Sequence, residues 1–155
     1  MSLPFGQTRT RVATRHALIA PDGHVKSNVP GIEGAATIIL INEAMGARFA
    51  QLLVTFETGG RASMPANEVE TCGYFEAGSG RVVIGGLKKR CESGGYFFAP
   101  AGQAWSITSP ARGTRVTLFQ RKYLPLAGVD SPRPIIGEAS RVKGRPFLGD
   151  PDARL

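Results

Sequence analysis

The chain has 155 residues, of which 42% are hydrophobic and 20% are charged, with 20 glycines and 11 prolines. This composition excludes a disordered chain, and the length suffices for one domain that folds without a disulfide or a metal. The net charge of +7 is dispersed and is not interleaved with aromatic residues, so we expect no nucleic-acid partner. No hydrophobic run is long enough to cross a membrane and no signal peptide is recognised, so we expect a cytoplasmic protein without a membrane partner.

Short strands separated by glycine and proline turns are expected through most of the chain. A strand-like piece over 16–20 ends at the turn that begins with Pro21, and the continuous apolar run 35–41 predicts a strand buried on both faces. Asn42 could cap a helix, but Gly46 and the β-rich residues after it favour a turn and a strand. Further strands are expected at 49–56, 68–75, 81–84, 96–99, 104–108 and 114–121. This pattern predicts an all-β sandwich or barrel with little helix.

Two motifs with regularly placed glycines lie between Gly59 and Ser109. They read Gly59-x5-Pro65-x-Asn67-x3-Thr71-x6-Gly78 and Gly94-x5-Pro100-x-Gly102-x2-Trp105-x3-Ser109. This spacing resembles the double motif of the cupin family, G-x5-H-x-H-x3-E-x6-G followed by G-x5-P-x-G-x2-H-x3-N. The resemblance implies a cupin double-stranded β-helix, which is a jelly-roll barrel. Because glycine readily adopts a positive φ, we expect Gly59 and Gly60 to form a tight turn between two strands.

The positions at which cupins carry their metal ligands hold different residues in this chain. Pro65 and Asn67 replace the two histidines of the first motif, Thr71 replaces its glutamate, and Trp105 replaces the histidine of the second motif. An indole donates one hydrogen bond and accepts none, so Trp105 cannot be a ligand, and we expect it to fill the barrel mouth by packing. We therefore predict no catalytic residue, no cofactor-binding residue and no metal ligand here. The four positions are predicted to line the barrel as a degenerate site.

Two cysteines and two histidines complete the set of candidate ligands. The two residues of each pair lie too far apart in the sequence for the short spacing of a zinc site; the pairs are Cys72 with Cys91 and His16 with His24. We therefore expect the cysteines to be small buried hydrophobic residues. A nucleophilic Cys72 paired with a distant histidine stays open but lacks an orienting acid in a recognisable pattern. The pair Cys72-Gly73 stands where a bulky apolar pair is usual in a strand, and we expect it to loosen the packing or reshape a pocket.

The chain divides into three regions by composition. We expect an N-terminal arm over 1–15, a cupin barrel over 16–126, and an extended linker or tail over 127–155. From Gly128 onward the chain carries four prolines and only isolated apolar residues, which is typical of an extended segment. We expect this segment to lead toward a second domain that this chain does not contain.

Six segments, most of them outside the two motifs, carry a more specific resemblance. They are similar to the first half of the ureidoglycine aminohydrolases, once called glyoxylate-induced proteins, and they comprise 16–25, 29–31, 44–46, 95–100, 119–123 and 146–155. The resemblance implies a two-cupin enzyme of purine and allantoin breakdown, which releases ammonia from ureidoglycine by hydrolysis. It places a manganese ion in the second cupin, whose glutamate, histidine and glutamine ligands match no position in this chain.

The resemblance thus predicts that this chain is the non-catalytic, metal-free N-terminal cupin of such a protein, inactive alone and without a cofactor of its own. Its expected partner is a second cupin domain or another copy of the chain in an oligomer. The alternative is a stand-alone cupin that binds a small ureide or a similar ligand without turnover. A sugar epimerase-type cupin is a third reading, but it needs a His–Asp general base in the barrel, and His16 and His24 precede the barrel strands.

Overall fold

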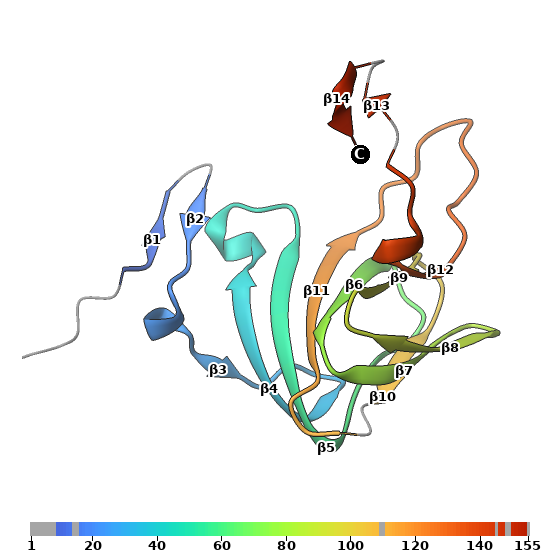
Figure 1. Ribbon diagram of the computed structural model, residues 1–155. Helices are drawn as coiled ribbons and strands as arrows, with labels where there is room; N and C mark the ends of the chain where they lie inside the picture. Colours follow the sequence, from blue (N-terminus) through green and yellow to red (C-terminus); the bar gives the residue numbers. More distant parts are fainter. Residues whose placement is uncertain (1–8, 14–15, 109–110, 145, 148–149, 155) are drawn as a thin grey trace, which may run out of the picture.

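The computed structural model describes residues 9–13, 16–108, 111–144, 146–147 and 150–154. These residues form strands and three 3-10 turns, η1 (Pro21–Gly23), η2 (Glu43–Met45) and η3 (Ala139–Arg141), which confirms the expected all-β fold with little helix (Figure 1). None of the helical segments in these ranges is long and apolar enough to span a bilayer. The strands are β1 (Arg11–Val12), β2 (Ala17–Leu18), β3 (Lys26–Ser27), β4 (Ile32–Ile41), β5 (Ala50–Met64), β6 (Val69–Ala77), β7 (Ser79–Ile84), β8 (Leu87–Glu92), β9 (Gly95–Ala99), β10 (Trp105–Thr108), β11 (Arg115–Lys122), β12 (Ile135–Glu138), β13 (Pro146–Phe147) and β14 (Asp150–Arg154).

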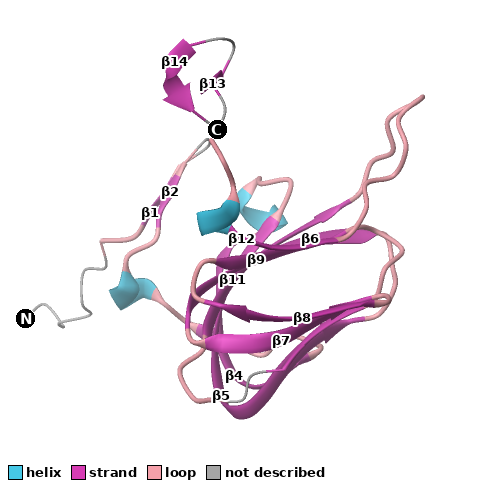
Figure 2. Ribbon diagram, turned by 45° about the vertical axis from the view of Figure 1, so that its right-hand side comes forward, coloured by secondary structure: helices cyan, strands magenta, loops and turns pink. Residues whose placement is uncertain are grey.

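Ten of these strands form one antiparallel sheet that curls into a barrel (Figure 2). The strand order is β12-β9-β6-β11-β5-β10-β7-β8, with β4 also paired to β5 and β3 paired to β4. The two ends of this order, β12 and β8, contact each other, so the barrel is nearly closed. The predicted jelly-roll barrel is confirmed.

Strand β5 is one long strand that serves both halves of the barrel. Residues 50–55 of β5 pair with β11, whereas residues 61–64 pair with β10. The predicted turn at Gly59 and Gly60 is therefore wrong, because the strand continues through both glycines. Gly59 has a φ of 73°, and a Cβ on Gly60 would lie 2.3 Å from the carbonyl oxygen of Gly34 on β4. The two glycines let β5 bend between the two halves while it stays close to β4.

Strand β4 lies near one edge of the sheet, so the prediction of a strand buried on both faces is wrong. Only the short β3 pairs with its outer side, at Lys26 and Ser27. Within β4 only Thr37 is buried, and Ile39 is 38% exposed. A continuous apolar run does not by itself distinguish a central strand from an edge strand with a half-buried face.

The segment between β4 and β5 contains a single 3-10 turn. The side-chain oxygen of Asn42 accepts a hydrogen bond from the N–H of Met45 at 3.2 Å, which is the capping contact expected of an asparagine at a helix start. Gly46 then takes a φ of 81° and ends the turn. The expectation of a turn followed by a strand is confirmed, although the turn is helical.

The hydrophobic core fills the barrel interior. Strands β5, β6, β9, β10 and β11 each send alternate side chains inward, as the period of two along a strand requires. Ile136 of β12 packs against this core, so the chain after β11 returns to the barrel and pairs with β9. The buried members of the core are Leu52, Val54, Phe56, Ala62, Phe75, Val82, Ile84, Cys91, Phe97, Ala99, Trp105, Ile107, Val116 and Leu118.

Candidate functional site

The structure brings two of the four degenerate motif positions together and leaves the other two at the surface. Thr71 lies on β6 and is fully buried, and Trp105 begins β10 and is 4% exposed. Pro65 and Asn67 lie in the loop between β5 and β6, and both are exposed. Ser109, the last position of the second motif, lies outside the described residues.

Trp105 and Thr71 form a hydrogen-bonded pair inside the barrel. The indole N–H of Trp105 donates to Oγ1 of Thr71 at 3.1 Å, and the Thr71 hydroxyl lies 4.0 Å from Sδ of Met64 as a weak donor. The indole also packs against the ring of Phe97, with a centroid separation of 5.6 Å and an interplanar angle of 47°. A buried N–H that has a partner and an aromatic neighbour is a stable arrangement, so the pair acts as part of the core.

Asn67 uses its polar groups to hold the two motif loops in place. Its side-chain oxygen accepts a hydrogen bond from the N–H of Val69 at 2.8 Å, which is a local turn of the kind asparagine favours. Its backbone carbonyl accepts from the N–H of Gly102 at 2.7 Å, which ties the first motif to the second. The amide oxygen of Asn67 is therefore already engaged at the surface and is not directed at the Thr71–Trp105 pair.

The four side chains do not form a donor set for a divalent metal ion. They offer a pyrrolidine ring, an engaged amide, a hydroxyl that accepts from an indole, and the indole itself, and none of these is the imidazole or carboxylate that first-row metals favour. Across the residues that the structure describes, no group of three or more His, Cys, Asp or Glu side chains is placed to hold a metal. The residues at these positions therefore do not fit the metal that the cupin motif implies.

Of the two effects expected of Cys72-Gly73, the looser packing is wrong, whereas Cys72 does line a concavity of about 330 Å³. Gly73 leaves space on β6 for the ring of Phe97, which is 1% exposed, and a Cβ on Gly73 would lie 2.0 Å from Cε1 of that ring. The missing side chain is thus replaced by an aromatic ring from the neighbouring strand β9, with which Gly73 is paired.

The two cysteines lie in different environments. Cys91 is 1% exposed and belongs to the core, as expected, whereas Cys72 is exposed on the outer side of β6, so its predicted burial is wrong. Desolvation raises the pKa of both thiols above the ordinary value for a cysteine, which lowers the thiolate fraction at neutral pH. A raised pKa works against a nucleophilic role for Cys72.

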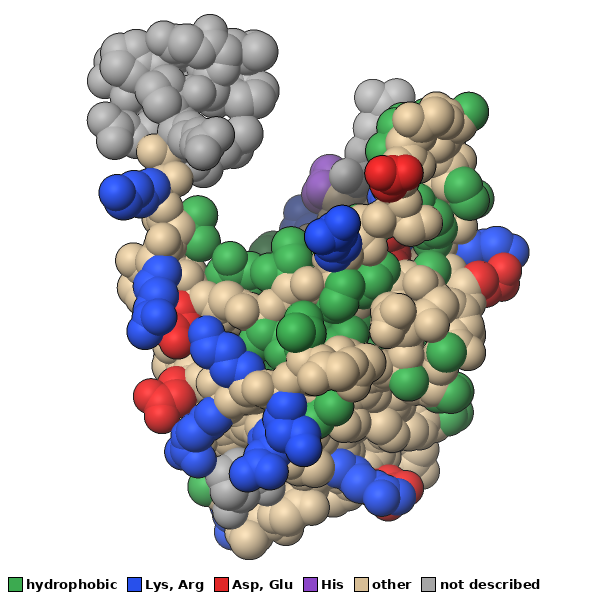
Figure 3. Space-filling view, turned by 90° about the vertical axis from the view of Figure 1, so that its right-hand side faces the viewer, with side chains coloured by type: hydrophobic (Ala, Val, Ile, Leu, Met, Phe, Trp, Pro, Cys, Tyr) green, Lys and Arg blue, Asp and Glu red, His purple; other side chains and the backbone are tan. Residues whose placement is uncertain are grey.

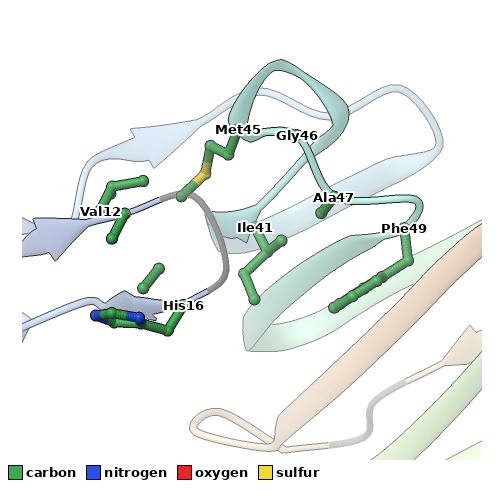
Figure 4. Close-up of a pocket in the computed structure, with 9 residues that line it drawn as sticks. Val12, His16, Ile41, Met45, Gly46, Ala47 and Phe49 are labelled. Carbon is green, nitrogen blue, oxygen red and sulfur yellow. The ribbon is translucent and has the colours of Figure 1, made fainter.

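Two concavities outside the barrel were not anticipated from the sequence. One has a volume of about 250 Å³, and Figure 4 shows His16 and Val12 of the N-terminal hairpin on one side of it and Ile41 and Phe49 on the other. The second has a volume of about 330 Å³ and is lined by Phe49, Cys72 and Phe119, among others. These residues come from strands far apart in the sequence, so no local motif marks them.

A third concavity, of about 470 Å³, lies beside the motif loops and is lined by Pro65 and Trp105 with their neighbours. Its lining residues include no ionisable side chain, and they are Ser63, Met64, Pro65, Val83, Gly85, Ala104, Trp105 and Ser106. Such a surface can offer hydrogen bonds and apolar contact but no acid, base or nucleophile.

The barrel and its motif loops show that the fold is that of the cupins. An RmlC-like cupin from Shewanella frigidimarina superposes with a TM-score of 0.54 at 18% identity, over 65% of this chain and 86% of that structure. At this identity the likeness shows the fold alone. No protein family model matches the chain.

The chain is more specifically homologous to ureidoglycine aminohydrolases. It is 30% identical over 142 residues to the (S)-ureidoglycine aminohydrolase of Escherichia coli, over 90% of this chain and 54% of that enzyme. A probable (S)-ureidoglycine aminohydrolase of rice is 29% identical over 154 residues, which cover 94% of this chain and 46% of that protein. The crystal structure of protein Ylba from E. coli, of the DUF861 family, superposes with a TM-score of 0.82 at 29% identity, over 88% of this chain and 58% of that structure. The chain thus spans about half the length of the curated relatives it matches.

Proposed function

We propose that this chain is a non-catalytic, metal-free cupin module of a ureidoglycine aminohydrolase-like protein, in which it corresponds to the N-terminal half. The observation that carries the proposal is the buried Trp105–Thr71 hydrogen bond, which occupies two positions at which the cupin motif places metal ligands. The homology over 90% of the chain supports the assignment to this kind of protein, since the curated relatives are about twice the length of the matched region.

In this proposal the chemistry takes place elsewhere in the whole protein. Hydrolysis of ureidoglycine with release of ammonia would occur at a manganese ion in a second cupin, and this module would support that domain and take part in the oligomer. The proposal places the protein in the breakdown of purines and allantoin, in the cytoplasm. The filled interior supports a structural role, because Trp105 and Phe97 occupy space that a substrate would need.

Metal content and activity test this proposal together. The chain is produced in medium supplied with manganese, its metal is quantified by mass spectrometry, and ammonia release from ureidoglycine is followed with the E. coli enzyme as positive control. We expect less than about 0.1 metal ion per chain and no ammonia above the spontaneous rate, because the motif positions lack imidazole and carboxylate donors. One metal ion per chain together with turnover would overturn the proposal.

Binding without turnover is the second candidate, and the concavity of about 470 Å³ beside Pro65 and Trp105 is the observation that favours it. A cupin that binds a small ureide there would show a rise in Tm with allantoin or ureidoglycine that saturates. The scaffold proposal predicts no saturable rise. A saturable rise that is lost when Ser106 of this concavity is replaced by Tyr would favour the binding function.

A further inference from the structure

Basic side chains that are far apart in the sequence gather on the outer side of the barrel over β5, β10, β7 and β8. One row of residues paired across neighbouring strands runs from β8 to β4, and it consists of Arg90, Arg81, Thr108, Arg61 and Glu33. Val82, Ile107 and Ala62, which follow or precede members of this row along the chain, are buried, so the row itself faces solvent. Figure 3 views the molecule from the side on which Figure 1 shows β7 and β8, and Lys and Arg side chains gather over the lower half of this view.

A second row on the same side of the strands adds another base and several small side chains. It consists of Lys88, Val83, Ser106 and Ser63. We call the surface formed by the two rows the basic face. The concavity of about 470 Å³ adjoins the basic face, because Ser63, Val83 and Ser106 all line it. A partner that lies along the bases therefore has room for a side chain beside them.

The acids on and beside the basic face do not balance its four bases. Arg61 is paired with Glu33 at 2.9 Å and Arg90 with Glu92 at 3.4 Å, and all four of these side chains are more than half exposed. Exposed ion pairs contribute little to stability, so these two arginines remain able to bind other carboxylates. The other two bases of the face form no ion pair in the part of the chain that the structure describes. The face thus holds part of the excess positive charge of the chain.

Two of the arginines stand in an arrangement that is unfavourable without an anion. Arg81 on β7 and Arg90 on β8 lie directly opposite each other, and like charges at paired positions destabilise a sheet. Nη2 of Arg90 donates to Oγ of Ser79 at 2.7 Å, which leaves the guanidinium of Arg81 as the one without an acid. A carboxylate bound between the two guanidiniums would offset their repulsion and accept hydrogen bonds from both.

We infer that the basic face is a docking site for an extended acidic segment of another protein, with carboxylates at alternate positions. Arg90, Arg81 and Arg61 lie on β8, β7 and β5, and β8 and β5 are three strand spacings apart, or about 14 Å. About five residues of extended chain span the same distance, and their first, third and fifth side chains point to one side. Three carboxylates so placed meet three guanidiniums, each of which can bind a carboxylate through two parallel hydrogen bonds. Clusters of arginines recur in proteins as a means of recognising acidic motifs.

The borders of the basic face favour a short acidic segment over a nucleic acid. Glu33 ends the first row on β4, and Glu92 lies beyond Arg90 on β8, so a long phosphate backbone that crosses the face would meet an acid at each end. Neither row contains an aromatic side chain on which the bases of a single strand could stack. The inference does not depend on the proposed function, because it concerns binding at a surface and no step of hydrolysis.

Fluorescence anisotropy with a labelled peptide tests this inference on the whole chain. The probe is the peptide Gly-Glu-Ser-Glu-Ser-Glu-Gly, and its matched control carries Gln in place of each Glu. At about 50 mM salt the acidic peptide should bind saturably with a Kd below about 1 mM, and the control peptide should bind at least about tenfold more weakly. Salt at about 300 mM should weaken binding of the acidic peptide at least about threefold, because the contacts are exposed to solvent.

Arg81→Gln tests the face itself, and Arg48→Gln, at an exposed arginine outside the face, is the matched control. Arg81→Gln should raise the Kd of the acidic peptide at least about fivefold, whereas Arg48→Gln should change it less than about 1.5-fold. Arg81→Gln should not lower the urea midpoint, because it removes a like charge opposite Arg90. The absence of saturable binding, equal losses of affinity in the two variants, or tighter binding of a thymidine oligonucleotide or of phosphatidylserine vesicles than of the peptide would overturn the inference.

Discussion

The ring of Phe97 lies over the backbone of Gly73, so close that a Cβ on Gly73 would stand 2.0 Å from Cε1 and 2.5 Å from Cζ of the ring. Gly73→Ala should therefore force the ring of Phe97 to move within a packed core. We expect the free energy of unfolding to fall by about 1–3 kcal/mol, which is the usual cost of overpacking. The drop in the midpoint of urea unfolding, at unchanged m-value, measures it.

Gly86→Ala is the matched control for this substitution. Nothing lies within 4 Å of a Cβ built on Gly86, so the change in unfolding free energy should be within about 0.5 kcal/mol of zero. If Gly73→Ala is as stable as Gly86→Ala, then the ring of Phe97 has room to shift and the close approach has no energetic consequence.

The hydrogen bond between Trp105 and Thr71 can be measured with a double-mutant cycle. Thr71→Val removes the acceptor and leaves a buried indole N–H without a partner, which should cost about 1–3 kcal/mol of unfolding free energy. Trp105→Phe removes the donor and some volume, and the double variant should be less destabilised than the sum of the two single variants by about 1 kcal/mol. The measurement is denaturant unfolding of all four proteins, and additive effects would contradict a direct bond.

The short strands separated by turns were enough to predict an all-β sandwich or barrel, and the resemblance of the motif spacing to that of the cupins implied the jelly-roll barrel. The identity of residues 71 and 105 was enough to question a metal site, since a hydroxyl and an indole are poor ligands whatever their geometry. Their hydrogen bond could not be predicted, because it joins β6 to β10 across 34 residues and depends on the depth of each side chain in the barrel.

Where the structure differs from what the sequence predicts, the difference has an identifiable physical cause. Gly59 was expected in a turn because a positive φ is typical of turns, but a bent strand such as β5 uses the same conformation. The run 35–41 was expected to be central because it is apolar, although one side of β4 meets only β3. Gly73 was expected to loosen the sheet, because the neighbour that fills its space, Phe97, is recognisable only once the pairing of β6 with β9 is known.

The ion pair between Glu33 and Arg61 should make stability depend on pH in the acid range. Arg61 donates from Nε and Nη2 to the carboxylate at 3.1 Å and 2.9 Å, and these hydrogen bonds, together with its charge, hold the pKa of Glu33 below 4.5. Because the pKa is lowered in the folded state, the stabilisation is present above pH 4.5 and is lost as the pH falls through the lowered value.

Glu33→Gln tests this pH dependence. The difference in urea midpoint between the wild type and Glu33→Gln should be small at pH 7, because both side chains are exposed, and it should vanish as the pH is lowered from 4.5 toward 2. Arg61→Gln should behave in the same way, and 1 M salt should reduce the difference at pH 7. A difference that persists or grows at pH 2 would show that the effect of the substitution does not come from the ion pair.

The side chain of Thr114 anchors the turn between β6 and β7 to the loop before β11. Its hydroxyl accepts from the N–H of Ser79 at 3.3 Å and lies 3.1 Å from the carbonyl oxygen of Ser79, to which it can donate. A Cβ on Gly78 would lie 2.5 Å from the same hydroxyl, so the turn and the threonine are in close contact. Since Thr114 is fully buried, water cannot readily replace these bonds.

Thr114→Val should lower the free energy of unfolding by about 1–2 kcal/mol, because it removes the hydroxyl while it keeps the shape of the side chain. Thr108→Val, at an exposed position of β10, is the matched control and should change it by less than about 0.5 kcal/mol. Amide hydrogen exchange locates the effect, because the bonds of Thr114 reach Ser79 directly. Faster exchange at the N–H of Ser79 is expected in Thr114→Val, and unchanged exchange there together with full stability would show that the threonine does not hold the turn.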